Sequence, residues 1–170
     1  MKYKELTIKS LGLTRDLLLQ KLVNEHIHLN EYAHQLFKTD SFNNQPKKGD
    51  TIKIVEVALE DIGLRTGGTF AEIEVAMDKL NLTHCPLEFA PYIRLTYTDQ
   101  KSSMIKSINR HPPGAIKIFS KPVLENEDFP RGFYIRNIDG LLWLRGYKCS
   151  LDYQWDSKDR MIFQTKNSLE

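Results

Sequence analysis

This chain of 170 residues has no long apolar run, few cysteines and no strong excess of one charge. No apolar stretch approaches the roughly 18 residues that a membrane-spanning helix needs, and the first residues lack the apolar stretch of a signal peptide. The two cysteines, Cys85 and Cys149, are too few for a disulfide scaffold. We therefore expect a cytoplasmic protein that does not bind membranes and whose cysteines are reduced, buried thiols.

The charge of the chain is nearly balanced, with 24 Lys and Arg against 22 Asp and Glu. A net charge of +2 does not by itself indicate a polyanion-binding protein. The 7 prolines and 9 glycines are too few for a collagen-like or low-complexity chain. The composition instead predicts an ordinary globular fold, a single domain over residues 1–170.

Residues 1–40 are predicted to form a helical pair. Thr14 and Asn30 are suitable N-cap residues, and apolar residues follow each of them at helical spacing. These residues are Leu18, Leu19, Leu22 and Val23 after Thr14, and Tyr32, Ala33, Leu36 and Phe37 after Asn30. Residues 41–50 concentrate turn formers and charge, which predicts an exposed linker.

Residues 51–91 are predicted to contain a strand and a capped helix. The apolar pattern of residues 52–59 favours a strand followed by a helical turn. Thr69 and Glu72 have the spacing of a capping box at the start of a helix. This segment could be taken for a helix-turn-helix, but its second helix is acidic, which argues against binding of duplex DNA.

Residues 92–170 are predicted to form an antiparallel sheet. Apolar residues alternate with polar ones over residues 93–97, around residues 116–118 and near residues 161–163. Turns at residues 111–114, 125–132 and 156–159 separate the strands at short spacing, which favours antiparallel pairing. The fold class is therefore α+β, with N-terminal helices packed on a C-terminal antiparallel β-sheet.

The strongest local signal is a β-hairpin centred on Asp139 and Gly140. A two-residue loop sets Ile138 opposite Leu141, Arg136 opposite Trp143 and Tyr134 opposite Arg145. One side of the hairpin is apolar and should face the core; it carries Phe133, Ile135, Asn137, Leu142 and Leu144. The other side should point away from the core, and it carries Tyr134, Arg136, Ile138, Leu141, Trp143, Arg145 and Tyr147.

Guanidinium groups beside Trp and Tyr rings suit anionic or planar partners. The same pairs also stabilise ordinary sheets by cation–π contacts of about 0.5–1 kcal/mol each, so a purely structural role is the competing interpretation. We predict a noncatalytic binding module, without cofactor or metal, for a protein partner or a small anionic or aromatic ligand. Its predicted ligand-binding residues are Tyr134, Arg136, Trp143, Arg145, Tyr147 and Arg94. Binding of single-stranded nucleic acid by stacking is a further alternative.

An enzymatic alternative rests on His84, Cys85 and Glu88, with Arg94 as an anion clamp. These residue types could supply a nucleophile and a base for a small hydrolase or transferase. A cysteine before a proline is more often a packed apolar residue than a thiolate. The histidines near residue 28 lack a recognised metal-ligand spacing, and the acidic residues 125–128 lack the alternating oxygen ligands of a calcium loop.

Four segments of the chain form a recognisable pattern: residues 85–88, 94–100, 132–136 and 141–147. In these segments the sequence resembles a group of small bacterial cytosolic proteins of uncharacterised function. The resemblance implies a bacterial, cytosolic origin. It implies no activity, cofactor or catalytic residue.

Overall fold

A computed structural model describes residues 3–103 and 114–166; of the turn predicted at residues 111–114, all but Gly114 lies outside these ranges. The strands are β1 (Lys4–Lys9), β2 (His28–Leu29), β3 (Thr51–Ala58), β4 (Leu82–Thr83), β5 (Ile116–Ile118), β6 (Gly132–Ile138), β7 (Leu141–Tyr147) and β8 (Arg160–Thr165). The helices are α1 (Arg15–Asn24), α2 (Glu31–Phe37), α3 (Phe70–Lys79) and α4 (Ala90–Thr96). Short 3-10 turns occur at η1 (Asp40–Phe42), η2 (Leu59–Ile62) and η3 (Leu87–Phe89).

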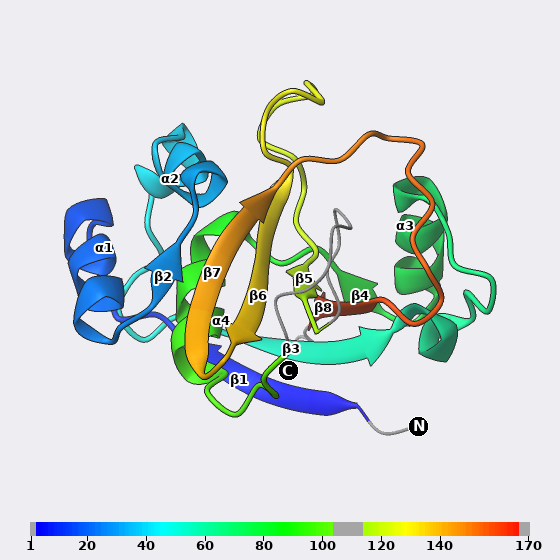
Figure 1. The fold of residues 1–170 in the computed structure, drawn as a ribbon, viewed down its shortest axis with the longest axis horizontal. Coiled ribbons are helices and arrows are strands. Elements are labelled where there is room, and N and C mark those ends of the chain that lie inside the picture. The colour runs from blue at the N-terminus through cyan, green and yellow to red at the C-terminus, as the bar shows by residue number, and fades with distance from the viewer. Residues whose placement is uncertain (1–2, 104–113, 167–170) are drawn as a thin grey trace.

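The strands form one curled sheet in the order β1-β3-β8-β5-β6-β7-β2, with β4 also paired to β8 (Figure 1). The α+β class is confirmed, but the prediction of a purely antiparallel sheet is wrong. β8 runs parallel to β5, and β2 runs parallel to β7. β8 lies between β3 and β5, which are not neighbours in the chain. It runs antiparallel to β3 and parallel to β5.

Three helices begin where the sequence predicts. The Asn30 side chain accepts a hydrogen bond from the Ala33 N–H at 2.9 Å, and Thr14 caps α1 in the same way. At α3 the capping box is complete, because Thr69 accepts from the Glu72 N–H while the Glu72 carboxylate accepts from the Thr69 N–H. Local capping chemistry therefore determines these helix starts.

Residues 92–97 do not form the predicted strand; most of them lie in α4. Tyr92, Ile93 and Arg94 are all buried, so the helix lacks the exposed polar stripe by which a 3.6-residue period is recognised. Pro91 lies in the first turn of α4, where a missing N–H has no cost to helix hydrogen bonding. The apparent alternation is thus a coincidence within a helix that is buried from Ala90 to Arg94.

Apolar side chains fill both sides of the sheet. One core is formed between the sheet and helices α1, α2 and α4, and it includes Ile54, Phe133, Ile135 and Ile162. It also takes in Phe42 from the segment expected to be exposed. The other core lies with α3 and includes Val57, Tyr134, Tyr147, Trp155 and Met161. Figure 1 shows α1 and α2 toward one end of the sheet and α3 at the other.

None of the helices in the described ranges has the length and apolar character needed to cross a membrane.

Candidate functional site

The β6–β7 hairpin has the register that the sequence predicts. Tyr134 pairs with Arg145, Arg136 with Trp143 and Ile138 with Leu141. Asp139 and Gly140 both adopt positive φ, at 51° and 86°, as a two-residue type I′ turn requires. The register places Tyr134, Arg136, Trp143 and Arg145 on one side of the sheet.

That side of the hairpin is more covered than the sequence suggests. Tyr134 and Tyr147 are buried in the core that contains Trp155, because α3 and the segment around residue 155 pack on this side of the sheet. Trp143 and Arg145 stay half-buried, near the β7 edge. The opposite side faces a core as predicted, with Phe133, Ile135 and Leu144 fully buried.

A stacked row of side chains crosses β2, β7 and β6. The ring of His28 lies 5.0 Å from the ring of Trp143, and the Arg145 guanidinium lies 4.9 Å from the same indole. Arg145 Nε donates to the Tyr134 hydroxyl at 2.7 Å. We call His28, Trp143, Arg145 and Tyr134 the hairpin face. The stacking and the hydrogen bond hold Arg145 in one orientation.

Two further cations lie beside the hairpin face on the same side of the sheet. Arg136 Nε donates to Ser103 Oγ at 3.1 Å; burial lowers the pKa of Arg136, and the charge of Arg145 acts in the same direction. Lys117 in β5 pairs with Tyr134 and is 1% exposed. Burial lowers the pKa of Lys117 to about 8. Lys117 is not among the predicted site residues, because a lysine between two isoleucines in a strand usually faces solvent.

Arg94 does not lie on the hairpin face. It is fully buried in α4, on the opposite side of the sheet. Its guanidinium donates to Gln100 Oε1 at 2.6 Å and to the Trp143 carbonyl at 3.3 Å, and also to the Tyr97 carbonyl. Burial lowers the pKa of Arg94 to about 10. The structure therefore places Arg94 as a link between α4 and the hairpin backbone.

The residues of the enzymatic alternative are not brought together. Cys85 is buried in the core beside α4, and burial raises the pKa of its thiol. His84 instead stacks on Phe119, at 5.1 Å, and its Nε2 lies 3.0 Å from Glu74 Oε1. Phe119 belongs to the core on the other side of the sheet. A thiol kept protonated and apart from the adjacent imidazole is poorly suited to be a nucleophile.

A polar cluster that the sequence did not indicate surrounds the buried Glu56 in β3. Its Oε1 accepts a hydrogen bond from the Tyr97 hydroxyl at 2.6 Å, and its Oε2 accepts from Arg160 Nε and Nη2 at 3.1 and 3.0 Å. Burial and the hydrogen bond to Glu56 raise the pKa of Tyr97. A cavity of about 800 Å³ adjoins the cluster. Because both carboxylate oxygens are engaged, the cluster is internally satisfied and ties α4 to β3 and β8.

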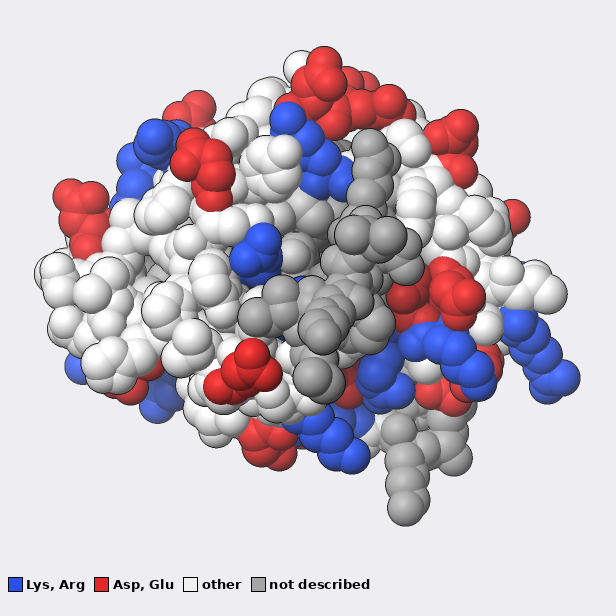
Figure 2. All heavy atoms as spheres, in the orientation of Figure 1, with Lys and Arg blue, Asp and Glu red and all other residues white. Residues whose placement is uncertain are grey.

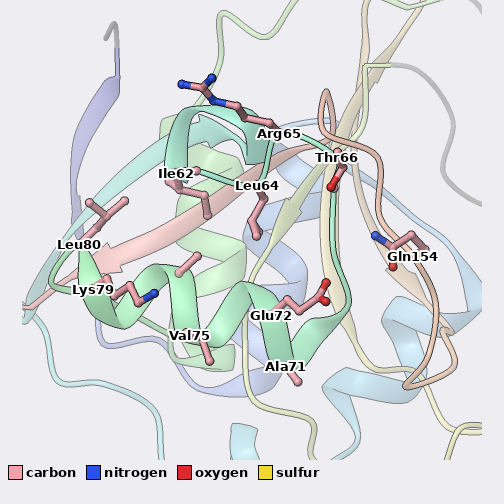
Figure 3. A pocket seen from close by; sticks show the side chains of 13 residues that line it. Ile62, Leu64, Arg65, Thr66, Ala71, Glu72, Val75, Lys79, Leu80 and Gln154 are labelled. Atoms are coloured by element: carbon pink, nitrogen blue, oxygen red, sulfur yellow. The ribbon is translucent and has the colours of Figure 1, made fainter.

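A groove of about 830 Å³ runs between α3 and residues 62–67 (Figure 3). Figure 3 shows Ile62 and Leu64 pointing toward α3, whereas the Arg65 guanidinium points away from it. Glu72, the carboxylate in the lining, is already hydrogen-bonded to the Thr69 backbone. The groove is therefore mainly apolar in character.

Comparison with protein-family models, with curated proteins and with solved structures finds no match for this chain. Within the described residues, no group of three or more His, Cys, Asp or Glu is placed to hold a metal ion.

Proposed function

We propose that this protein is a noncatalytic binding module that recognises an acidic side chain of a partner protein at the hairpin face. The observation that carries the proposal is the state of Arg145. Its guanidinium is half-buried and fixed by Trp143 and Tyr134, and no carboxylate of the described residues lies within salt-bridge distance of it. Its one hydrogen bond to a described residue uses Nε, which leaves the two terminal amino groups for a carboxylate.

The neighbouring cations support this assignment. Lys117 and Arg136 lie on the same side of the sheet as Arg145, and the charge of Arg145 is close enough to Arg136 to help lower its pKa. A fixed guanidinium beside an indole is typical of the residues that dominate protein–protein binding energy. The cavities described above are lined by other segments, which favours a partner protein over a small molecule, because small molecules bind in concave sites.

Single-stranded nucleic acid fits this face less well. Its binding by stacking needs several exposed rings along a basic groove, whereas Tyr134 and Tyr147 are buried. Figure 2 shows a region over α1, β2 and β7 that is largely uncharged, with Lys and Arg interspersed among Asp and Glu elsewhere in the view. Such a surface favours a few defined contacts over a broad attraction for phosphates.

Selection of random dodecapeptides displayed on phage tests the proposal. Wild-type protein is the bait, Arg145→Gln is the counter-bait, and Arg65→Gln is the matched control because Arg65 is an exposed arginine elsewhere on the surface. We expect enriched peptides to carry Asp or Glu next to an aromatic residue and to bind Arg145→Gln about tenfold or more weakly. The thermal midpoint of Arg145→Gln should stay near that of wild type. Peptides without acidic residues, or equal binding to both baits, would refute the proposal.

A further inference from the structure

A third cavity, of about 630 Å³, is distinct from the hairpin face. It lies between α3, the connection from β5 to β6 and the segment that follows β7, which arches over the top of the molecule in Figure 1. Much of its wall is apolar and is formed by Pro122, Leu124, Phe129 and Leu151. The cavity is therefore able to shelter a small apolar group from water.

One lining residue, Arg131, packs on an aromatic ring and has no ion pair among the residues that the structure describes. Its guanidinium carbon lies 3.6 Å from the ring centroid of Phe70, and its backbone N–H donates to the Tyr147 carbonyl at 2.7 Å. Its Nε is buried without a hydrogen bond, and no ion pair of Arg131 is found across residues 3–103 and 114–166. The terminal amino groups of Arg131 are therefore left for an anionic ligand, with which a guanidinium forms strong, charge-assisted hydrogen bonds.

Two of the three carboxylates that line the cavity are engaged in hydrogen bonds, and the third, Glu125, is exposed. Glu74 is bound to His84, and Glu127 accepts from the Leu151 N–H at 2.9 Å. Lys121 adds a second cation to the lining. Figure 2 shows acidic side chains gathered over the tip of the β5–β6 connection. These charges would discourage large polyanions at the entrance, whereas the cations of the lining favour a single anionic group inside.

We infer that this cavity binds a small organic anion, in which one carboxylate or phosphate is attached to an apolar body. The anionic group pairs with the terminal amino groups of Arg131, and the apolar body packs against Leu124, Phe129 and Leu151. The inference uses none of the residues of the hairpin face and is independent of the proposed function.

Matched pairs of acids and alcohols test the site by isothermal titration calorimetry. The probes are hexanoate against 1-hexanol and phenyl phosphate against phenol. For ligands of this size we expect the anions to bind with a Kd of about 1 mM and the alcohols about tenfold or more weakly. Alcohols that bind as well as the acids would overturn the inference. It would also be overturned if neither anion binds at about 10 mM, tenfold above the expected Kd.

Two variants locate the binding to this cavity. Arg131→Gln should weaken the anions about tenfold or more, with Arg65→Gln as the unchanged control. Because Arg131 packs on Phe70, its loss could disturb the fold. Leu124→Glu provides a second probe: Leu124 is half exposed, so a carboxylate there leaves Arg131 in place and repels the anion. Unaltered anion binding by either folded variant would exclude this cavity as the site.

Discussion

The ammonium group of Lys117 lies 4.9 Å from the ring of Trp155, and both side chains are buried. No hydrogen bond or salt bridge of this ammonium is present among the residues that the structure describes. The indole face offers part of the stabilisation that water would give. The remaining cost appears as the lowered pKa of Lys117, about 8. Lys117 therefore stays charged at neutral pH, and its burial lowers the stability of the folded state.

Replacing Lys117 with methionine should stabilise the protein at pH 7 by about 1–3 kcal/mol, because a buried charge gives way to an apolar side chain of similar length. The difference should shrink between pH 8 and pH 10. In that range unfolded Lys117 keeps its proton while the folded wild type loses it, so the unfolded chain binds more protons and wild-type stability rises with pH. Urea unfolding of both proteins at pH 7, 9 and 10 measures the effect. A Lys117→Met protein that is less stable throughout would show that the ammonium stabilises the fold.

Asn30 should matter more for stability than an ordinary helix cap. Its Oδ1 accepts from the N–H groups of Ala33 and Gly146, and its Nδ2 donates to the Gly146 carbonyl at 3.0 Å. Asn30→Ala should cost about 2–3 kcal/mol of unfolding free energy. Thr14→Ala, which removes a cap bond alone, should cost about 1 kcal/mol. Urea denaturation compares the two, and equal losses would contradict the linking role of Asn30.

Gly146 should tolerate no side chain. A Cβ atom there would lie 2.6 Å from the carbonyl carbon of Tyr32 and 2.8 Å from the nitrogen of Ala33, so α2 would have to move away from β7. Gly146→Ala should therefore lower stability by about 2–3 kcal/mol. At Gly132 the nearest atom is 3.7 Å away, and Gly132→Ala should change stability by less than about 1 kcal/mol. Thermal unfolding of both variants measures the difference in stability. Comparable losses of stability would show that α2 shifts away from β7 at little cost.

Cys85 should be chemically inert in the folded protein. It is 1% exposed, and burial raises the pKa of its thiol, so little thiolate is available at neutral pH. Iodoacetamide at pH 7.5 should label Cys85 in guanidinium chloride but not in buffer, as read by mass spectrometry of its tryptic peptide. Rapid labelling of the native protein would revive the enzymatic alternative.

Sequence patterns succeeded where one short segment determines the outcome. The caps at Thr14, Asn30 and Thr69 and the turn at Asp139 and Gly140 depend on neighbouring residues only, and so does the hairpin register that follows from the turn. Local chemistry of this kind is visible without knowledge of the tertiary structure.

Patterns failed where burial on two sides removes the contrast between polar and apolar positions. Arg94 was interpreted as a polar, accessible residue of a strand, yet it lies in a buried helix. Lys117 entered the sequence pattern only as the polar residue between Ile116 and Ile118, yet it is buried with its ammonium over the ring of Trp155. β1 was missed because its alternation is short, and its pairing partner β3 lies more than forty residues further along the chain.

The position of β8 in the sheet also bears on how the protein folds. β8 joins β3 on one side to β5 on the other, so the β1–β3 pair and the β5–β6–β7 strands have no direct strand pairing until residues 160–165 arrive between them. Closing such long loops has an entropic cost that precedes the gain from contact, which places folding in the slow range, about milliseconds to seconds. Until β8 inserts, β3 and β5 expose unpaired backbone edges. The interval before insertion is therefore when the chain is most prone to aggregate.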